Sequence, residues 1–234
     1  MGLYLIIMGV QGAGKGTQAA FIQKTFNIPH VSTGDLFRAM KNRQDELAQR
    51  VQNIMNAGQL VPDDVTNEVL KDRLEQPDAQ QGVILDGYPR NVAQASWLKD
   101  YLAQRGEKLA AVLLLDLDPY TAFKRAFGRV KSTKTGETYN IYTNNEGLTW
   151  EFIEHPEHTY PPRLEAKLKA TGEILERRRD DEAFSVVKRI DTYLAETMPL
   201  VDYFRQQDVL YSIPADQPID VVSQAVQQVI EKVK

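Results

Sequence analysis

Short apolar runs alternate with longer amphipathic stretches along this chain, and the alternation predicts a parallel sheet flanked by helices. The predicted strands cover residues 4–8, 30–32, 83–85, 111–117 and 209–212. The clearest predicted helices cover residues 15–25, 118–127 and 219–233. The second of these begins with Asp118-Pro119, which is typical of an N-cap followed by proline at the first helical position. The hydrophobic pattern therefore predicts an α/β fold.

Two segments interrupt this alternation. Residues 32–61 have a helical pattern, and residues 128–181 are polar and rich in Gly, Thr, Asn and Pro. We expect both to be lobes inserted into one core domain, which would be formed by residues 1–31, 62–127 and 182–234.

The second lobe contains a long stretch at residues 140–169, with Trp150, Phe152, His155 and His158. The expected structure is an inserted loop with its own small apolar cluster. A metal site at His155 and His158 is disfavoured, because Pro156 disrupts a regular helix and no third ligand is evident.

Composition narrows the class of protein. The 234 residues carry a net charge of −4, which argues against a general nucleic-acid binder. With no cysteine, the chain has neither disulfides nor a thiolate zinc site. The apolar run at residues 3–8 is too short to span a membrane and follows no basic signal region. We therefore expect a cytoplasmic protein with no membrane or nucleic-acid partner.

A glycine-rich loop, Gly9-Val-Gln-Gly-Ala-Gly-Lys-Gly-Thr17, lies between the first predicted strand and a helix. Glycines let successive N–H groups point at phosphate oxygens, and the helix N-terminus adds partial positive charge. Lys15 can reach the β- and γ-phosphates. The general motif places Ser or Thr directly after the lysine, whereas Gly16 precedes Thr17 here, so Thr17 could contact metal or phosphate. The alternative, an ordinary strand–helix turn, does not explain the spacing. The loop predicts nucleotide binding.

Two further segments could bind an anionic acceptor. In Ser32-Thr-Gly-Asp-Leu-Phe-Arg38, Ser32 or Thr33 caps a helix whose first turns would also present Arg38. In Asp86-Gly-Tyr-Pro-Arg90, the aspartate ends a strand, where a carboxylate can hold Mg²⁺ through water. Arg90 can grip a phosphate with two N–H groups. A common structural turn explains the second segment equally well when it is taken alone.

Arginines recur in the second half of the chain. Arg125 and Arg129 are four residues apart and are expected on one helix face. Arg177-Arg-Arg-Asp-Asp181 and then Arg189 follow. If the bound nucleotide passes a phosphoryl group to an acceptor phosphate, the acceptor is already an anion. Such a transfer needs positive charge, alignment and exclusion of water rather than a general base. The alternative is a solvated helix surface with self-paired charges.

Together these segments resemble the adenylate kinase family of nucleoside monophosphate kinases from Tyr4 to about Pro218, with Gly58-Gln-Leu-Val-Pro62 and a downstream Gln94 included. Tyr88 replaces the usual Phe. The resemblance implies a P-loop NTPase-type, five-stranded parallel sheet wrapped by helices, with an inserted helical AMP lobe and a lid. It also implies reversible, Mg²⁺-dependent conversion of ATP and AMP into two ADP, by a monomer.

The same resemblance implies roles for individual residues. ATP would be held by Gly12, Ala13, Gly14, Lys15, Gly16, Thr17, Arg125, Arg129, Thr138, Tyr139 and Gln217. AMP would be held by Thr33, Arg38, Gln59, Leu60, Val61, Gly87, Tyr88, Pro89, Arg90, Gln94, Arg178 and Arg189. The catalytic residues would be Lys15, Arg90, Arg129, Arg178 and Arg189. Asp180 and Asp181 would help the lid to close, and Asp86 would hold Mg²⁺ through water.

The lid departs from the family pattern. Many bacterial relatives carry four zinc-binding cysteines there, and Ser132, Thr135, Leu168 and Thr171 fall near those positions in this chain. Leu168 has no atom to donate to a metal, so we expect no zinc.

Three other functions remain open. A kinase for UMP, CMP or GMP is the nearest, although Gln94 and the long lid favour AMP. A nucleotide-binding switch would not need the arginines at the point of transfer. A structural relic would be expected to have lost Lys15 or Arg90.

Overall fold

The computed structural model describes residues 2–57, 61–155, 157 and 161–234. The chain forms two compact units. The sheet unit consists of Met1–Gly9, Gly14–Asp116 and Ala195–Lys234, and the hairpin unit of Val10–Ala13 and Leu117–Leu194. The division into a core, an AMP lobe and a lid stays a prediction.

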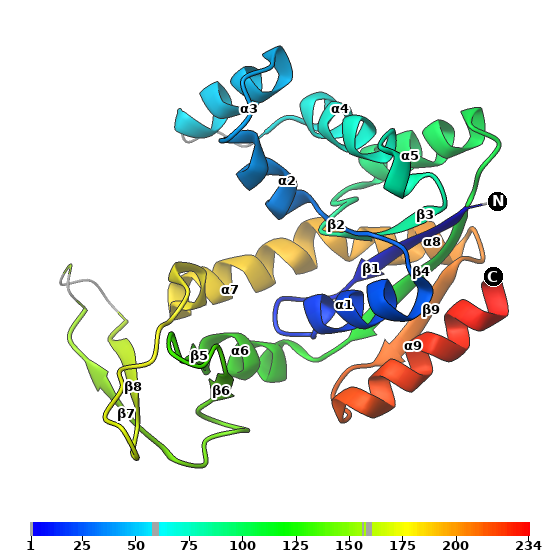
Figure 1. Cartoon of the computed structure of the whole chain (residues 1–234). Helices are drawn as coiled ribbons and strands as arrows, with labels where there is room; N and C mark the ends of the chain where they lie inside the picture. The colour runs from blue at the N-terminus through cyan, green and yellow to red at the C-terminus, as the bar shows by residue number, and fades with distance from the viewer. Residues whose placement is uncertain (1, 58–60, 156, 158–160) are drawn as a thin grey trace. The chain divides into compact units, whose positions relative to one another are not determined.

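A five-stranded sheet with the order β2-β3-β1-β4-β9 forms the centre of the sheet unit (Figure 1). The strands are β1 (Leu3–Met8), β2 (His30–Ser32), β3 (Gly82–Asp86), β4 (Leu109–Asp116) and β9 (Leu210–Pro214). Every pair is parallel. The predicted α/β fold with a parallel sheet is confirmed. The fourth strand ends at Asp116, so the prediction that it reaches Leu117 is wrong: Asp116 O accepts a hydrogen bond from Ala215 N, and a helix cap follows at Asp118.

The apolar N-terminal run explains the centre of this sheet. β1 pairs with β3 on one side and β4 on the other, and Leu5 and Ile6 are fully buried. A strand covered on both faces has no need for polar alternation, so it is apolar throughout. Because parallel strands end at one edge, the segments that follow β2 and β3 meet there, and Thr33 donates to the carbonyl oxygen of Gly87.

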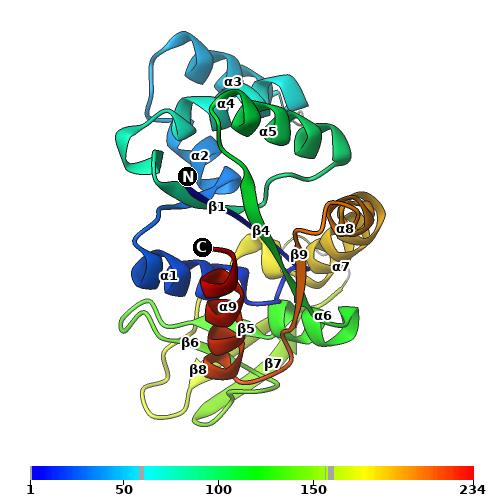
Figure 2. The same ribbon diagram turned by 90° about the vertical axis from the view of Figure 1, so that its right-hand side faces the viewer.

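Helices cover the sheet. Those of this unit are α1 (Lys15–Phe26), α2 (Thr33–Met40), α3 (Glu46–Asn56), α4 (Asp63–Leu74), α5 (Val92–Gln104), α8 (Pro199–Arg205) and α9 (Ile219–Val233), with a 3₁₀ turn at Pro77–Ala79. Figure 2 shows α9 beside β4 and β9. Side chains of α4, α5 and α8 pack against Tyr4, Ile6 and Met8 of β1.

A second apolar cluster joins the three helices α2, α3 and α4. Met40, Val51 and Val69, one from each helix, are at most 2% exposed. The segment predicted to be helical at residues 32–61 therefore does form helices, and α4 packs with them.

The hairpin unit has its own core. Its helices are α6 (Pro119–Phe127) and α7 (Ala183–Thr192), and its strands are β5 (Arg129–Lys131), β6 (Thr138–Asn140), β7 (Leu148–Ile153) and β8 (Arg163–Leu168). A 3₁₀ turn at Arg179–Asp181 precedes α7, and a π-helical turn at Tyr193–Thr197 leads into the sheet unit. Both strand pairs are antiparallel.

The expectation of an inserted loop with its own apolar cluster is wrong. Residues 148–153 and 163–168 pair as a hairpin, because β7 alternates apolar and polar residues and Leu148, Leu164 and Ala166 share one buried face. These side chains join the cluster of Phe127 on α6, and Phe152 stacks on the Phe127 ring with 6.3 Å between centroids. His158 lies outside the described residues.

Over the described residues, no helix has both the length and the apolar content that a membrane span requires. Nor do three or more His, Cys, Asp or Glu side chains gather in that part of the chain as metal ligands would.

Candidate active site

The phosphate loop connects β1 to α1 through backbone that only glycine adopts easily. Gly12 and Gly14 have φ of 92° and 90°, in the left-handed region. A Cβ on Gly12 would lie 2.6 Å from the carbonyl oxygen of Ala122 on α6. Gly14 is the N-cap of α1, and among the described side chains none caps this helix. The N-terminus of α1, with its partial positive charge, therefore directly follows the loop.

The remaining predicted residues of the loop differ in their exposure and contacts. Lys15 Nζ donates to the carbonyl oxygen of Gly9 at 2.7 Å, so its ammonium group lies along the loop. Ala13 is buried, whereas Gly16 and Thr17 are exposed in the first turn of α1.

The predicted acceptor helix is α2. Ser32 caps it, because its Oγ accepts a hydrogen bond from Asp35 N at 3.4 Å, and the prediction that Ser32 or Thr33 caps this helix is confirmed. Thr33 Oγ1 instead donates to the carbonyl oxygen of Gly87 at 3.0 Å, which ties the start of α2 to the loop after β3. Arg38 is exposed and pairs with Asp35, and that hydrogen bond lowers the carboxyl pKa below its ordinary value.

Asp86 ends β3 beside the end of β2, where Ser32 is its register partner. Its Oδ2 atom lies 3.3 Å from His30 Nε2. The sequence prediction placed Asp86 correctly at a strand end but missed His30, because parallel pairing brings together residues 56 positions apart.

Gln94 lies at the centre of a polar network. Its Oε1 accepts from the backbone N–H of Arg90 at 2.8 Å, and its Nε2 donates to Asp63 Oδ1 at 2.6 Å. Asn91, the N-cap of α5, donates to the other carboxylate oxygen of Asp63 at 2.9 Å. Gln94 is 4% exposed, so this network fixes its amide.

Tyr88 extends the network toward α4. Its buried hydroxyl donates to Asn67 Oδ1 at 2.6 Å, a contact that Phe could not make. Burial raises the Tyr88 pKa above its ordinary value, and the charge of Asp63 adds to this. Pro89 is buried after Tyr88, whereas Arg90 is exposed and its Nε donates to the carbonyl oxygen of Gly87 at 3.1 Å.

Part of the predicted adenine-binding segment is described. Gln59 and Leu60 lie outside the described residues, as does Gly58. Val61 packs against the cluster formed by α2, α3 and α4.

In the hairpin unit, Arg129 makes a bidentate ion pair with Asp181. Its Nε and Nη2 atoms donate to the two carboxylate oxygens at 2.8 and 2.6 Å, and the Asp181 side chain is fully buried. Gln11 of the phosphate loop donates to the same carboxylate at 3.3 Å.

The prediction that Arg125 and Arg129 share one helix face is wrong. Arg125 lies in the last turn of α6, but the helix ends at Phe127 with Gly128 as its C-cap, and Arg129 begins β5 by pairing with Asn140 of β6. A Cβ on Gly128 would lie 2.7 Å from side-chain atoms of Asn140 and Tyr142 and 2.8 Å from the carbonyl oxygen of Lys124, so a larger residue would force these groups to shift. Asn140 Nδ2 in turn donates to the carbonyl oxygens of Lys124 and Arg125.

Arg178 and Arg189 both bond to Asp180. Arg178 grips its carboxylate through Nε and Nη2 at 2.9 and 2.8 Å, and Arg189 adds Nη1. Burial raises the Asp180 pKa, but the two guanidinium groups outweigh it and leave the pKa below its ordinary value. The carboxylate thus orients two of the predicted phosphate-binding arginines.

Three further residues predicted to contact ATP lie on β6 and just before α9. Thr138 and Tyr139 lie on β6, and the Tyr139 hydroxyl donates to Glu137 at 2.6 Å, a bond that raises the tyrosine pKa. In the sheet unit, Gln217 is exposed and donates to Asp216.

Hydrogen bonds hold the segment around Ser132, one of the positions where the sequence analysis expected no zinc. Ser132 Oγ donates to Glu173 Oε1 at 2.8 Å and accepts from the N–H groups of Lys134 and Thr135 at 3.2 and 3.1 Å. Leu168 instead pairs with Leu148 in the hairpin.

The sequence analysis missed Gln11, Asp63 and Arg177, whose partners are other protein groups. Arg177 is buried, and its Nη2 donates to the carbonyl oxygens of Phe127 and Asp181. The only sequence signal was its place in the arginine run.

A phosphate loop after the first strand of a parallel sheet, with arginines gathered beside carboxylates, defines a P-loop phosphotransferase. The family model described as adenylate kinase matches residues 7–209. The chain belongs to the adenylate kinase family.

Curated relatives agree over nearly the full chain. An adenylate kinase from Streptomyces coelicolor is 40% identical over 228 residues, covering 97% of this chain and 98% of the relative. One from Caldanaerobacter subterraneus subsp. tengcongensis is 38% identical over 226 residues, covering 97% and 95%. One from Streptococcus suis is 38% identical over 231 residues, covering 98% and 99%.

Proposed function

We propose that this chain transfers the terminal phosphoryl group of ATP to AMP through the phosphate loop, the α2 segment and the paired arginines described above. Membership of the adenylate kinase family makes it a phosphotransferase that converts ATP and AMP reversibly into two ADP. The observation that carries the assignment of the ATP site is the N-terminus of α1, whose N-cap is Gly14 and which receives no cap from a described side chain.

The arginines would supply the electrostatics of the reaction. Asp180 and Asp181 hold Arg178, Arg189 and Arg129 through charge-assisted hydrogen bonds, so these guanidinium groups are oriented before substrate binds. Groups fixed in advance stabilise the charge of the transferring phosphoryl group without reorganising during the reaction. AMP brings its own anionic nucleophile, so the chain needs no general base.

Asp86 would hold the Mg²⁺ of ATP·Mg²⁺ through water. A carboxylate is a ligand type that Mg²⁺ prefers, and the edge at the end of β3 is where β2 and its following helix also meet. The ion would neutralise charge on the ATP phosphates. His30, on Asp86 Oδ2, would orient this carboxylate.

Gln94 would read the base of AMP. Asp63 can only accept a hydrogen bond, so it forces the amide nitrogen of Gln94 toward α4 and leaves the amide oxygen facing Arg90 N. Each amide atom then keeps one further bonding position, as an adenine edge with a donor and an acceptor requires.

The test is ADP formation from ATP, Mg²⁺ and AMP, with UMP, CMP and GMP in parallel and Arg90→Ala as the variant. Turnover on AMP alone, reduced by orders of magnitude in Arg90→Ala, is the expected result. Preferential turnover of another monophosphate would assign a different kinase, and ATP binding without any turnover would assign a nucleotide-binding switch.

We also propose that the enzyme works as a monomer in the cytoplasm and serves nucleotide homeostasis, with ATP, AMP and ADP as its partners and no zinc. Sedimentation of the pure protein with and without nucleotide tests the monomer: a mass of 26.5 kDa is expected in both cases.

A further inference from the structure

Arg177 is a buried cation whose role the family assignment does not explain. Its side chain is 2% exposed, and its guanidinium lies 4.8 Å from the centre of the Phe127 ring. Burial lowers the Arg177 pKa below its ordinary value, although Glu182 and Asp181 act in the opposite direction. A buried charge is costly and is kept only where its hydrogen bonds compensate for lost hydration.

Those hydrogen bonds converge on two backbone positions. Nη2 donates to the carbonyl oxygen of Phe127 and to that of Asp181, each at 2.6 Å. Nη1 makes a longer contact of 3.4 Å with Glu182 Oε2. Within the described chain, Nε has no hydrogen-bond partner, so the two carbonyl contacts account for most of the compensation.

The two carbonyls flank the ion pair between Arg129 and Asp181. Phe127 ends α6 two residues before Arg129, and Asp181 supplies the carboxylate that Arg129 grips. The backbone before Arg177 is fixed as well, because Glu176 forms an isolated bridge with Lys131 through two backbone hydrogen bonds of 2.9 and 2.8 Å. One guanidinium therefore joins the backbone on both sides of this pair.

We propose that Arg177 is a positioning residue for Arg129: by holding the Phe127 and Asp181 carbonyls together, it sets the direction in which the Arg129 guanidinium points. The terminal Nη2 carries two N–H groups in the guanidinium plane, one for each carbonyl, so a side chain that does not place a nitrogen with two N–H groups at this position loses at least one of the two contacts. The consequence for ATP rests on the proposed function, in which Arg129 contacts the ATP phosphates. The claim that Arg177 positions the Arg129 side chain does not depend on the proposed function.

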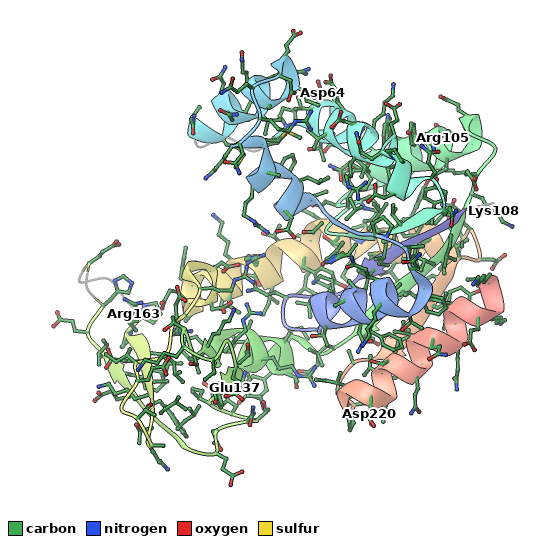
Figure 3. All side chains as sticks on the ribbon, viewed as in Figure 1. Asp64, Arg105, Lys108, Glu137, Arg163 and Asp220 are labelled. Atoms are coloured by element: carbon green, nitrogen blue, oxygen red, sulfur yellow. The ribbon has the colours of Figure 1, made fainter. Side chains whose placement is uncertain are left out.

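The matched control is Arg163, labelled in Figure 3, on β8. Arg163 is in the same unit and shares Glu182 with Arg177, at 3.6 Å, but its side chain is 43% exposed. Arg163→Met therefore removes an arginine and a Glu182 contact without removing either carbonyl contact.

The first readout is the Nε–H resonance of Arg129 in protein labelled with ¹⁵N-arginine, assigned by its loss in Arg129→Lys. We expect Arg177→Met to shift or broaden this signal and to speed its exchange with water, whereas Arg163→Met leaves it in place. An unchanged signal in folded Arg177→Met would overturn the proposal. If Arg177→Met does not fold, Arg177→Lys is measured instead: it keeps the charge, but its amine ends one bond short of the position of Nη2. The same two outcomes apply to it.

The second readout is kinetic. Arg177→Met should lower kcat/KM for ATP by about tenfold to a hundredfold, the cost of a misplaced contact at the reacting phosphates, while Arg163→Met stays near wild type. A lower melting temperature with unchanged kcat and KM would assign Arg177 a purely structural role and overturn the proposal. A shifted Arg129 signal in a protein that does not phosphorylate AMP would support the positioning and refute the proposed function instead.

Discussion

Asp63 and Asp64 are neighbours in the first turn of α4, yet their surroundings differ. Asp63 accepts hydrogen bonds from Asn91 and Gln94, whereas Asp64, labelled in Figure 3, has an exposed side chain that pairs with Arg50. Both carboxylates lie in the first turn of α4, near the positive end of the helix dipole, so replacing each in turn tests the contact with Gln94.

Asp63→Ala should raise KM for AMP about fivefold to tenfold, because Gln94 loses the bond that orients its amide, worth about 1 kcal/mol. KM for ATP should stay unchanged. Steady-state kinetics with each substrate varied in turn provides the measurement, with Asp64→Ala as the control. Equal effects of the two replacements would show that Gln94 does not depend on Asp63.

The phosphate loop offers a second matched pair at this scale. Gly12 and Gly14 share a left-handed backbone, but only at Gly12 would a Cβ meet the Ala122 carbonyl oxygen, at 2.6 Å. A Cβ on Gly14 would have no atom within 4 Å in the described part of the chain. Backbone strain is therefore common to both positions, and the steric clash is specific to Gly12.

Gly14→Ala should destabilise the protein by about 1–2 kcal/mol, the cost of placing an L-residue in the left-handed region. Gly12→Ala should cost a further 1–3 kcal/mol or so, because α6 must shift away from the new methyl group. Thermal unfolding of both variants by calorimetry measures the difference. Equal melting temperatures would contradict the predicted contact with α6.

Among the helices, strands and loops, sequence patterns correctly predicted the features that depend on neighbouring residues. The positions of the strands along the chain, the cap at Ser32 and the glycine-rich loop follow from residues close together in sequence. The β7–β8 hairpin was missed because its buried side chains pack against Phe127 of α6. The end of the helix after Arg125 was missed because Gly128 lies against the side chains of Asn140 and Tyr142. Contacts between distant segments do not appear in local periodicity.

The shared core of the hairpin unit leads to a prediction about β7 and β8. Leu164 is 1% exposed in the cluster with Phe127, so Leu164→Ala should remove about 2–4 kcal/mol of packing. Amide hydrogen exchange should speed up across β7, β8 and α6 and change little in the five-stranded sheet, because the two units have separate cores. Thr149→Ala, on the exposed face of β7, is the control. Uniform acceleration through both units would show that they open together.

For the whole molecule, acid stability depends on carboxylates whose folded-state pKa is depressed. Asp180 is a carboxylate of this kind, and it also accepts hydrogen bonds from Arg178 and Arg189 of the candidate site. A depressed pKa means that the unfolded chain binds protons more readily, so stability is present above the ordinary Asp pKa of about 4 and is lost as the pH falls through the lower folded value. Asp35, Asp118 and Glu173, also with lowered pKa, act in the same direction.

Asp180→Asn should therefore lower the melting temperature at neutral pH, where the wild-type carboxylate attracts Arg178 and Arg189. Because the wild type loses this attraction once Asp180 is protonated, the difference between the two proteins should shrink as the pH falls below about 4. Calorimetry of both proteins from pH 7 to the lowest pH at which they fold reversibly tests this. A difference that stays constant over the whole range would mean that Asp180 stabilises the protein by packing rather than by charge, and that its pairing with the arginines does not control their orientation.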